Sequence, residues 1–271
     1  MTKIVGYIHI CQMPGWQKSF DILIKSVIES GLYEATDEIR IGVVSKTGQV
    51  EPDERLTDPK FNIVYVGICS EYERATLHHM RKRAENETCK YWYLHTKGLR
   101  HFGTSREKSV INWIDIMLYW NVTKWRDAVQ KLDSYDTYGC MRNEFKIGVY
   151  HYSGNFWWGN SSYIVTLPEK INKHYYAPED WIGLNLQKKA FCAWNHNYND
   201  NYYINIPKKD YELEITKDFT NLYTNNTKLE KINPGIRLPE PPNFNSADNL
   251  DTSIQYTVQK KKESSIFRKI S

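Results

Sequence analysis

Hydrophobic and polar residues follow two alternating patterns over residues 1–200. Short apolar runs of strand length are separated by stretches in which apolar residues recur every three or four positions. The strand-like runs are residues 4–10, 39–44, 62–66 and 90–94, with shorter ones at 138–141 and 147–150. The helix-like stretches are 20–28, 77–84, 110–118 and 125–132. Strands that alternate with helices predict an α/β fold with a mixed, mainly parallel central sheet covered on both faces.

Local signals predict where further elements begin and end. Gly31 falls where a helix C-cap glycine belongs, and residues 161–167 predict a short helix that ends before Pro168. Pro178 suits a first helical position, and the two acids behind it suit a first turn. Residues 191–206 are rich in Tyr, Asn and His and predict another strand region.

The composition changes after residue 207. Lys, Asp, Asn and Thr dominate from there on, and prolines cluster between Pro234 and Pro242. Such a composition predicts a polar, extended tail, with a short basic amphipathic end at 260–270. We therefore predict one α/β domain over residues 1–207 and a polar C-terminal extension over residues 208–271.

Composition and charge disfavour several classes of protein. The chain is 41% hydrophobic and 25% charged, which is ordinary for a soluble globular protein. No apolar run approaches the ~20 residues of a membrane span, and residues 1–6 lack the features of a signal peptide, so we expect a cytoplasmic protein. The five scattered cysteines, without CxxC spacing, argue against a disulfide framework or a zinc site. The net charge of +4 comes from basic residues interspersed with acids, which disfavours nucleic-acid binding.

Aromatic residues concentrate in one polar segment. The chain holds 20 Tyr and 9 Trp, whose flat amphipathic rings suit sugars and other ring-shaped ligands. The segment His151–Trp158 reads HYSGNFWW, with Ser, Gly and Asn directly before two adjacent tryptophans. Successive strand side chains point to opposite faces, so Trp157 and Trp158 cannot both enter one core. One ring is expected to line a cleft or pack under a loop; the alternative is an aromatic core strand with a glycine bulge.

A second informative segment, His95-Thr96-Lys97-Gly98, follows an apolar strand. In sheets of this kind ligands bind beyond the carboxyl ends of the strands. That rule places the loops 11–16, 67–73 and 95–100 at one rim. A Lys and a His there, beside a Gly that permits close backbone approach, suit a diphosphate, whereas the alternative is a surface turn with solvated charges. Near the end of the domain, Glu179 and Asp180 read as an ordinary helix start or as the source of a general base that faces the cleft.

Taken in order, these segments resemble one enzyme family, the small nucleotide-sugar glycosyltransferases of the GT-A type. Such enzymes are found in bacterial polysaccharide clusters and in large DNA viruses, and the Asn-, Lys- and Tyr-rich composition favours a viral member such as a chlorovirus capsid-glycan transferase. The matching pieces are Ser30–Tyr33, Tyr93–Gly98, Tyr135–Gly139, His151–Trp158 with Tyr163 and Leu167-Pro168, and Glu179–Trp181. They span roughly residues 1–200.

The resemblance implies a Rossmann-like GT-A domain that moves a sugar from a nucleoside-diphosphate sugar to a hydroxyl of a glycan acceptor, with inversion. A UDP-sugar is favoured, for example UDP-xylose or a UDP-hexose. The donor and its diphosphate would be held by His9, Ile10, Cys11, Ser45, His95, Thr96, Lys97 and Gly98. The acceptor would contact His151, Ser153, Gly154, Asn155, Trp157 and Trp158. Asp180 would be the catalytic base, with Glu179 as the second choice.

The expected metal dependence and the expected function both have alternatives. GT-A enzymes usually present Asp-x-Asp to hold Mn²⁺ or Mg²⁺, and this chain contains no such triplet. Lys97 could neutralise the leaving diphosphate without a metal, or His95 and His196 could help to coordinate a divalent cation. A non-catalytic carbohydrate-binding protein would use the same aromatics but leave the paired acids without a role. A nucleotidyltransferase would need a Gly-rich phosphate loop, which is absent from the sequence.

Overall fold

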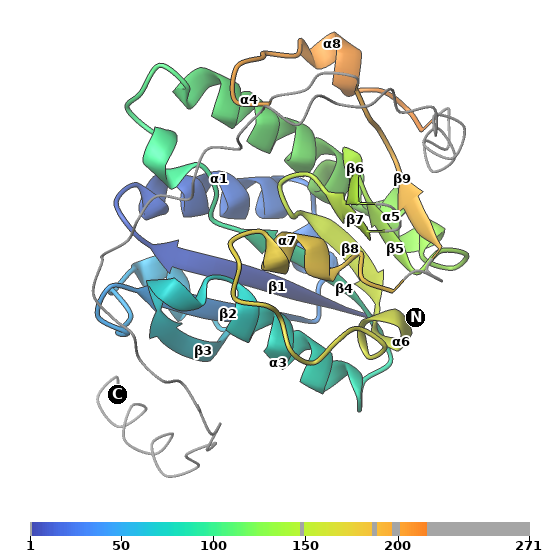
Figure 1. Cartoon of the computed structure of the whole chain (residues 1–271), viewed down its shortest axis with the longest axis horizontal. Helices are drawn as coiled ribbons and strands as arrows, with labels where there is room; N and C mark the ends of the chain where they lie inside the picture. Colours follow the sequence, from blue (N-terminus) through green and yellow to red (C-terminus); the bar gives the residue numbers. More distant parts are fainter. Residues whose placement is uncertain (1, 147–148, 186–188, 197–200, 216–271) are drawn as a thin grey trace. The chain divides into compact units, whose positions relative to one another are not determined.

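The two hydrophobic patterns become a sheet and the helices that cover it (Figure 1). The structure is a computed structural model that describes residues 2–146, 149–185, 189–196 and 201–215. Seven strands form one sheet in the order β3-β2-β1-β4-β8-β5-β9. Their bounds are β1 Lys3–Gln12, β2 Glu38–Ser45, β3 Phe61–Ile68, β4 Cys89–His95, β5 Thr137–Gly139, β8 Trp157–Asn160 and β9 Ala190–Cys192. Two further strands, β6 Arg142–Lys146 and β7 Val149–Tyr152, pair with each other alone.

The sheet is mixed and mostly parallel, as predicted. Strand β1 pairs in parallel with β2 and β4, β2 with β3, and β5 with β9. Only β8 runs against its neighbours β4 and β5 among these seven strands. The carboxyl ends of the six co-directional strands therefore meet at one edge, and the chain enters β8 from that same edge.

Helices cover both faces of the sheet. Helices α1 and α4 lie on one face, and α3, α6 and α7 lie on the other (Figure 1). The bounds are α1 Trp16–Glu29, α2 Leu32–Ala35, α3 Arg74–Ala84, α4 Glu107–Leu118, α5 Trp125–Lys131, α6 Ser161–Ile164, α7 Ala177–Trp181 and α8 Lys208–Tyr211. Short 3₁₀ turns occupy Glu54–Thr57, Cys69–Glu71 and Leu99–His101, and a π-helical turn at Tyr119–Thr123 extends α4. Along α1 the buried side chains recur at the predicted helical spacing, so its apolar stripe faces the sheet.

The adjacent tryptophans of β8 enter two different cores. Trp158 pairs with Trp92 and belongs to the core beneath α1 and α4. Trp157 pairs with Tyr93, stacks on its ring at 5.0 Å and belongs to the core beneath α3 and α7. The predicted opposite orientation is confirmed. The prediction that one ring lines a cleft is wrong, because both rings are 1% exposed or less.

Several predicted element boundaries shift. The helix expected over residues 161–167 is confined to α6, and the strand region expected over 191–206 shrinks to β9. The strand expected at 147–150 begins at Val149 as β7, and residues 147–148 lie outside the described residues.

Packing continues beyond the predicted domain boundary at residue 207. Helix α8 belongs to the stretch assigned to the extension, yet its Tyr211 is 1% exposed and packs in the core beneath α4. The chain divides into two units, Met1–Leu229 and Glu230–Ser271, and all described residues belong to the first. The rest of the predicted extension, with its basic end at 260–270, lies outside the described residues.

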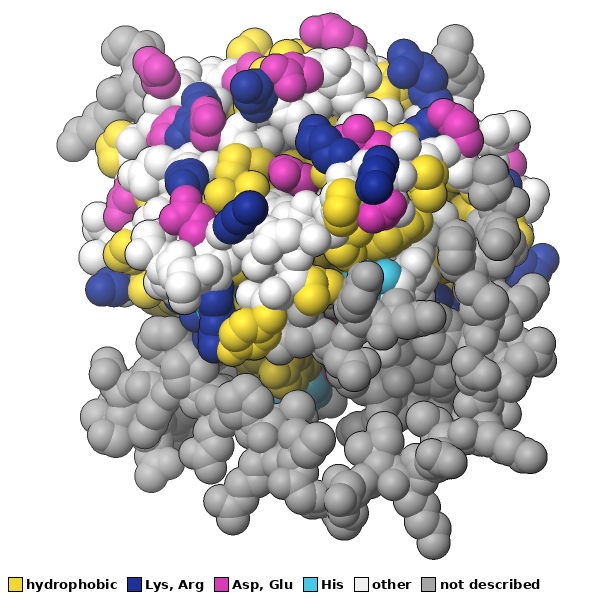
Figure 2. Space-filling view, turned by 90° about the horizontal axis from the view of Figure 1, so that it is seen from above, with side chains coloured by type: hydrophobic (Ala, Val, Ile, Leu, Met, Phe, Trp, Pro, Cys, Tyr) yellow, Lys and Arg dark blue, Asp and Glu magenta, His cyan; other side chains and the backbone are white. Residues whose placement is uncertain are grey.

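The surface of the described residues gives two further observations. None of the described helices combines the length and the apolar character that crossing a membrane requires. Figure 2 views the molecule from the side of α4 and α8, where basic and acidic side chains lie interspersed. On the described part of that face, therefore, the positive charge is not concentrated in one patch.

The guanidinium group of Arg40 is buried near the start of β2. Arg40 of β2 is 2% exposed, and its terminal nitrogens donate to both carboxylate oxygens of Glu87, each at 2.8 Å. It also donates to Glu38 at 2.8 Å. Burial disfavours the ionised form of Glu87, but the hydrogen bonds and charge of Arg40 outweigh burial and lower the pKa of Glu87 to about 2.

The substitution Glu87→Gln is expected to lower the free energy of unfolding by about 2 kcal/mol at pH 7, because Arg40 loses a charged, bidentate acceptor. The pKa of Glu87 in the folded protein lies below its ordinary value of 4.5. The wild-type advantage is therefore complete above about pH 5 and disappears as the pH falls towards 2. Urea denaturation of both proteins across this range measures the effect.

Glu85→Gln is the matched control for this prediction. Glu85 lies two residues away, and its 37% exposed side chain pairs with Arg81 one helical turn earlier. An exposed pair of this kind contributes less than about 0.5 kcal/mol. Equal losses in the two variants would contradict the assigned importance of the buried pair.

Candidate functional site

The ends of β1 and β4 are joined at the carboxyl edge of the sheet. Because His9 and His95 lie side by side in the parallel register, the residues that follow them are neighbours. The Thr96 N–H donates to the His9 carbonyl at 2.9 Å, and the Thr96 hydroxyl accepts from the Cys11 N–H at 2.9 Å. The predicted rim therefore exists between the loops 11–16 and 95–100, and Thr96 serves to hold it together.

Lys97 places an ammonium group at this rim. Its backbone is fixed by Ser19 of α1, whose hydroxyl accepts from the Lys97 N–H at 2.9 Å and donates to its carbonyl at 3.0 Å. The ammonium lies 4.1 Å from the centre of the Trp113 ring. Within the described part of the chain, this ammonium makes no ion pair within 4.0 Å. Burial lowers the pKa of Lys97, and the charges of Glu179 and Glu73 oppose that shift.

The glycine of the segment before β8 connects the rim to α7. Gly154 has a φ of +92°, a region that favours glycine, and a Cβ there would lie 2.3 Å from the Met117 sulfur. Its carbonyl lies 3.0 Å from His95 Nε2, and its N–H donates to Glu179 Oε1 at 2.6 Å. One residue therefore joins β4, the β8 entrance and α7.

His95 is neutral in this arrangement. A carbonyl only accepts, so the Gly154 contact assigns the proton to His95 Nε2. Burial lowers the pKa of His95 to about 4, although Glu179 opposes the shift. The 3.5 Å approach of His95 Nδ1 to Glu73 is consequently not an ion pair at pH 7.

Asn155 holds a strained backbone and an unused donor. Its φ is +60°, uncommon for a residue with a side chain. The side-chain oxygen accepts from Trp157 Nε1 at 2.8 Å, whereas the amide nitrogen has no partner among the described residues although Asn155 is 3% exposed. The fully buried hydroxyl of Tyr93, beneath Trp157, is likewise without a described partner. Buried donors of this kind are costly, so they point to a bound water or ligand atom.

The two acids of α7 have different surroundings. Glu179 is engaged by the backbone of Gly154. Asp180 Oδ1 lies 3.4 Å from His151 Nδ1, and the Asp180 side chain keeps 22% of its surface exposed against 2% for His151. Both acids are half-buried, so solvent reaches each of them, and Asp180 differs from Glu179 in having the His151 imidazole beside it.

Two features of the rim were not predicted from the sequence. Glu73, the residue before α3, approaches His95, and its negative charge favours the charged form of Lys97. Tyr175 reaches the same region from the segment before α7, where its hydroxyl accepts from Arg100 at 2.8 Å and its ring meets Tyr72 edge-on at 5.6 Å. The expected rim loop 67–73 already contained Glu73, but nothing in the sequence distinguished it from the other acids.

Other predicted site residues pack or form hydrogen bonds within the fold. The Ile10 side chain is fully buried in the core, so a contact between Ile10 and a nucleoside would have to come from its backbone. His9 Nδ1 lies 2.8 Å from the Thr76 hydroxyl, and burial lowers the pKa of His9 to about 4. Ser45 is buried, and its hydroxyl accepts from Gln49 at 3.1 Å in the turn after β2. Gly98 is required by its φ of +79° and by its packing on Val110.

The remaining predicted residues are buried or contact other parts of the chain. Trp157 and Trp158 offer no free ring face, so the prediction that one of them stacks on an acceptor sugar is wrong. Ser153 is half-buried and accepts from Asn201 at 3.4 Å. His196 follows β9, with its ring 5.3 Å from that of Trp194. In the described ranges, no group of three or more His, Cys, Asp or Glu side chains is arranged so that it could hold a metal ion.

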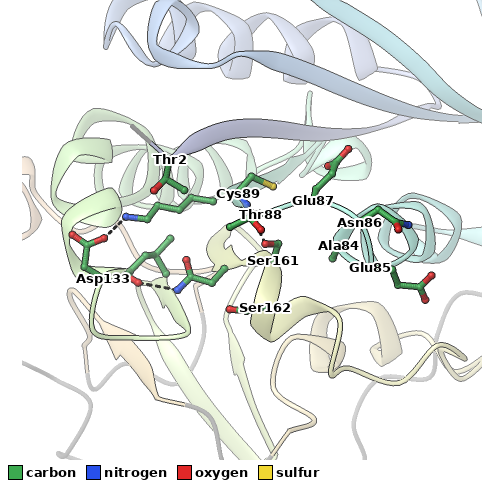
Figure 3. Close-up of a pocket in the computed structure, with 13 residues that line it drawn as sticks. Thr2, Ala84, Glu85, Asn86, Glu87, Thr88, Cys89, Asp133, Ser161 and Ser162 are labelled. Carbon is green, nitrogen blue, oxygen red and sulfur yellow. Dashed lines mark hydrogen bonds and ion pairs between the residues drawn. The ribbon is translucent and has the colours of Figure 1, made fainter.

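A hollow with a volume of about 640 Å³ lies at the opposite edge of the sheet (Figure 3). Its wall comes from the end of α3, the start of β4 and the start of α6. Several of its polar groups are engaged with one another: Lys90 binds Asp133, Asn160 donates to the Leu132 carbonyl, and the Cys89 N–H donates to the Ser161 hydroxyl. The buried Asn155 amide and Tyr93 hydroxyl, which have no described partner, lie near the carboxyl edge instead. We take that edge as the candidate site.

The substitution Gly154→Ala is expected to cost about 3 kcal/mol of unfolding free energy, because it combines a positive φ with a clash against Met117. Gly103→Ala is the matched control, since Gly103 has a φ of +76° but open space around its Cα. It should cost about 1 kcal/mol. Chemical denaturation of both variants measures the difference, and equal costs would contradict the tight packing assigned to Gly154.

Comparison with known proteins adds no family to this description. No family model matches the chain, and no curated protein matches it. The function is therefore inferred from the residues of the candidate site and from the resemblance of its segments.

Proposed function

We propose that this protein is a GT-A-type glycosyltransferase that moves a sugar from a nucleoside-diphosphate sugar, with UDP favoured, to a hydroxyl of a glycan acceptor. One observation carries the proposal. The ammonium of Lys97 stands without an ion pair among the described residues, at the edge where the Gly154 loop meets the acids of α7. A half-buried cation whose charged form is favoured by the carboxylates of Glu179 and Glu73 suits a reaction that separates a diphosphate from a sugar carbon.

The diphosphate is the part of the donor that Lys97 recognises. Leaving-group departure places negative charge on the phosphate oxygens, and a partly desolvated ammonium stabilises that charge more than a solvated one does. The Asn155 amide and the Tyr93 hydroxyl supply unused hydrogen-bond capacity in the same region. A divalent cation would add charge to the diphosphate when bound, and its contribution is tested by including Mn²⁺ in the assays below.

Asp180 is the proposed base. It removes the proton of the acceptor hydroxyl while the oxygen attacks the anomeric carbon and the bond to the diphosphate breaks. The His151 imidazole lies 3.4 Å from this carboxylate, an approach that becomes an ion pair when the imidazole is protonated. Glu179 is a positioning residue in this proposal, because its carboxylate is occupied by the Gly154 N–H.

Because the tryptophans of β8 are buried, a tyrosine side chain is the proposed contact with the acceptor sugar. Tyr176 is 42% exposed, and its carbonyl accepts from the Asp180 N–H at 3.0 Å. Its ring packs edge-on against Tyr175 at 5.0 Å. An exposed ring one helical turn before the base suits stacking on a sugar.

The substitution Lys97→Met is expected to weaken UDP binding at least about ten-fold, because a charge-assisted contact to phosphate is lost. Isothermal titration with UDP, with and without Mn²⁺, measures the loss. Lys18→Met is the matched control, since Lys18 also lies near an aromatic ring, Phe102, but pairs with Glu107. Unchanged UDP affinity in Lys97→Met, or an equal loss in both variants, would remove the basis of the proposal.

The substitution Asp180→Asn is expected to lower sugar transfer by about a thousand-fold and to leave UDP affinity nearly unchanged. Product formation from UDP-sugars and glycan acceptors measures the rate, with the titration above as the control for binding. Persistent transfer would exclude Asp180 as the base. Glycan binding that neither requires nor responds to any nucleotide would instead favour a carbohydrate-binding protein.

A further inference from the structure

Two cysteines that are far apart in the sequence meet at the rim. Cys11 lies at the carboxyl end of β1, and Cys69 opens the short turn that follows β3. Their sulfur atoms are 3.9 Å apart. They meet because β2 pairs with both strands in register, so that Gln12 and Ile68 each lie beside Ser45.

These two thiols differ from the other cysteines of the chain in their access to solvent. Cys11 and Cys69 are half-buried, whereas Cys89, Cys140 and Cys192 are buried. A small oxidant can therefore reach the pair from solvent. The turn Cys69–Glu71 is a single 3₁₀ turn at the surface, and it has to move towards β1 for the sulfurs to close from 3.9 Å to the ~2 Å of a disulfide.

We propose that Cys11 and Cys69 form a redox-modification site, which hydrogen peroxide converts to an intramolecular disulfide that thiols can reduce again. One thiolate attacks a peroxide oxygen, the O–O bond breaks, and the sulfur becomes a sulfenic acid as one water leaves. The second thiol attacks that sulfur and expels the hydroxyl as a second water. The two sulfurs together lose two electrons and two protons, and the peroxide is reduced to two molecules of water.

The charges around the pair assign Cys69 as the sulfur that reacts first. Burial raises the pKa of both thiols, and for Cys11 the neighbouring Cys69 and Glu73 raise it further. The cation Lys46 opposes the shift at Cys69. Cys69 therefore carries the larger thiolate fraction, and Cys11 is the resolving thiol.

The disulfide would join the end of β1 to the turn that precedes Tyr72 and Glu73. Tyr72 has a φ of +50°, and Glu73 approaches His95 at 3.5 Å, so this turn carries part of the rim. Oxidation would thus restrain one wall of the candidate site. The modification itself does not depend on the proposed transferase activity, and its test uses no substrate.

The test exposes the reduced full chain to a small molar excess of hydrogen peroxide and follows its intact mass. Expected is a loss of about 2 Da and of two titratable thiols, both restored by dithiothreitol. Peptide mapping without reduction should show Cys11 joined to Cys69. Circular dichroism before and after treatment establishes that the fold is retained.

Three variants make the result specific. Cys69→Ser and, separately, Cys11→Ala should each prevent the 2 Da loss, and Cys11→Ala should accumulate the sulfenic acid as a gain of about 16 Da. Cys89→Ser is the matched control and should behave as the wild type. A disulfide between other cysteines, a cross-link between two chains, or an unchanged thiol count in folded protein would each overturn the proposal.

Discussion

The candidate site depends on the two hydrogen bonds made by the backbone of Gly154. Its carbonyl meets His95 at the end of β4, and its N–H meets Glu179 in α7. The backbone passes so close to Met117 that a side chain has no room there. Because β4, the entrance to β8 and α7 come from distant parts of the chain, this single junction places the residues that follow each of them at one edge. The junction joins His95, Gly154 and Glu179. In the sequence, Lys97, Asn155 and Asp180 follow these residues within two positions.

Electrostatics at this edge follow from burial as much as from charge. His95 is kept neutral by burial, so that it donates to a carbonyl instead of pairing with Glu73. The ammonium of Lys97 rests on an indole ring, and the two carboxylates that favour its charged form lie beyond ion-pair distance. An ammonium group without an ion pair among the described residues is the basis of the proposed contact with a diphosphate. The acids of α7 differ in their contacts, since Glu179 accepts from the Gly154 backbone and Asp180 approaches His151.

Most of the aromatic side chains named in the two cores serve packing. Both tryptophans of β8 fill cores on opposite faces of the sheet, and Trp157 stacks on Tyr93. The alternative of an aromatic core strand therefore describes β8 better than a sugar-binding surface does. Exposed rings are found elsewhere, at Tyr176 before α7 and at Tyr203 after β9. Composition could indicate an excess of aromatic rings, but exposure decides which of them a ligand can touch.

The sequence by itself determined the fold class and the location of the rim. Alternating periods of two and 3.6 residues specify strands and helices, and parallel strands bring the loops after them to one edge, so Lys97 could be predicted as a rim residue. The tertiary structure alone decided the roles within that rim. It placed Glu179 against Gly154, brought Glu73 close to His95, and buried both tryptophans of β8 in the cores. It also brought together Cys11 and Cys69, which sequence spacing had given no reason to pair. The physical reason is that periodicity reports which face a side chain takes, whereas exposure, pairing and proton affinity depend on neighbours that distant parts of the chain supply.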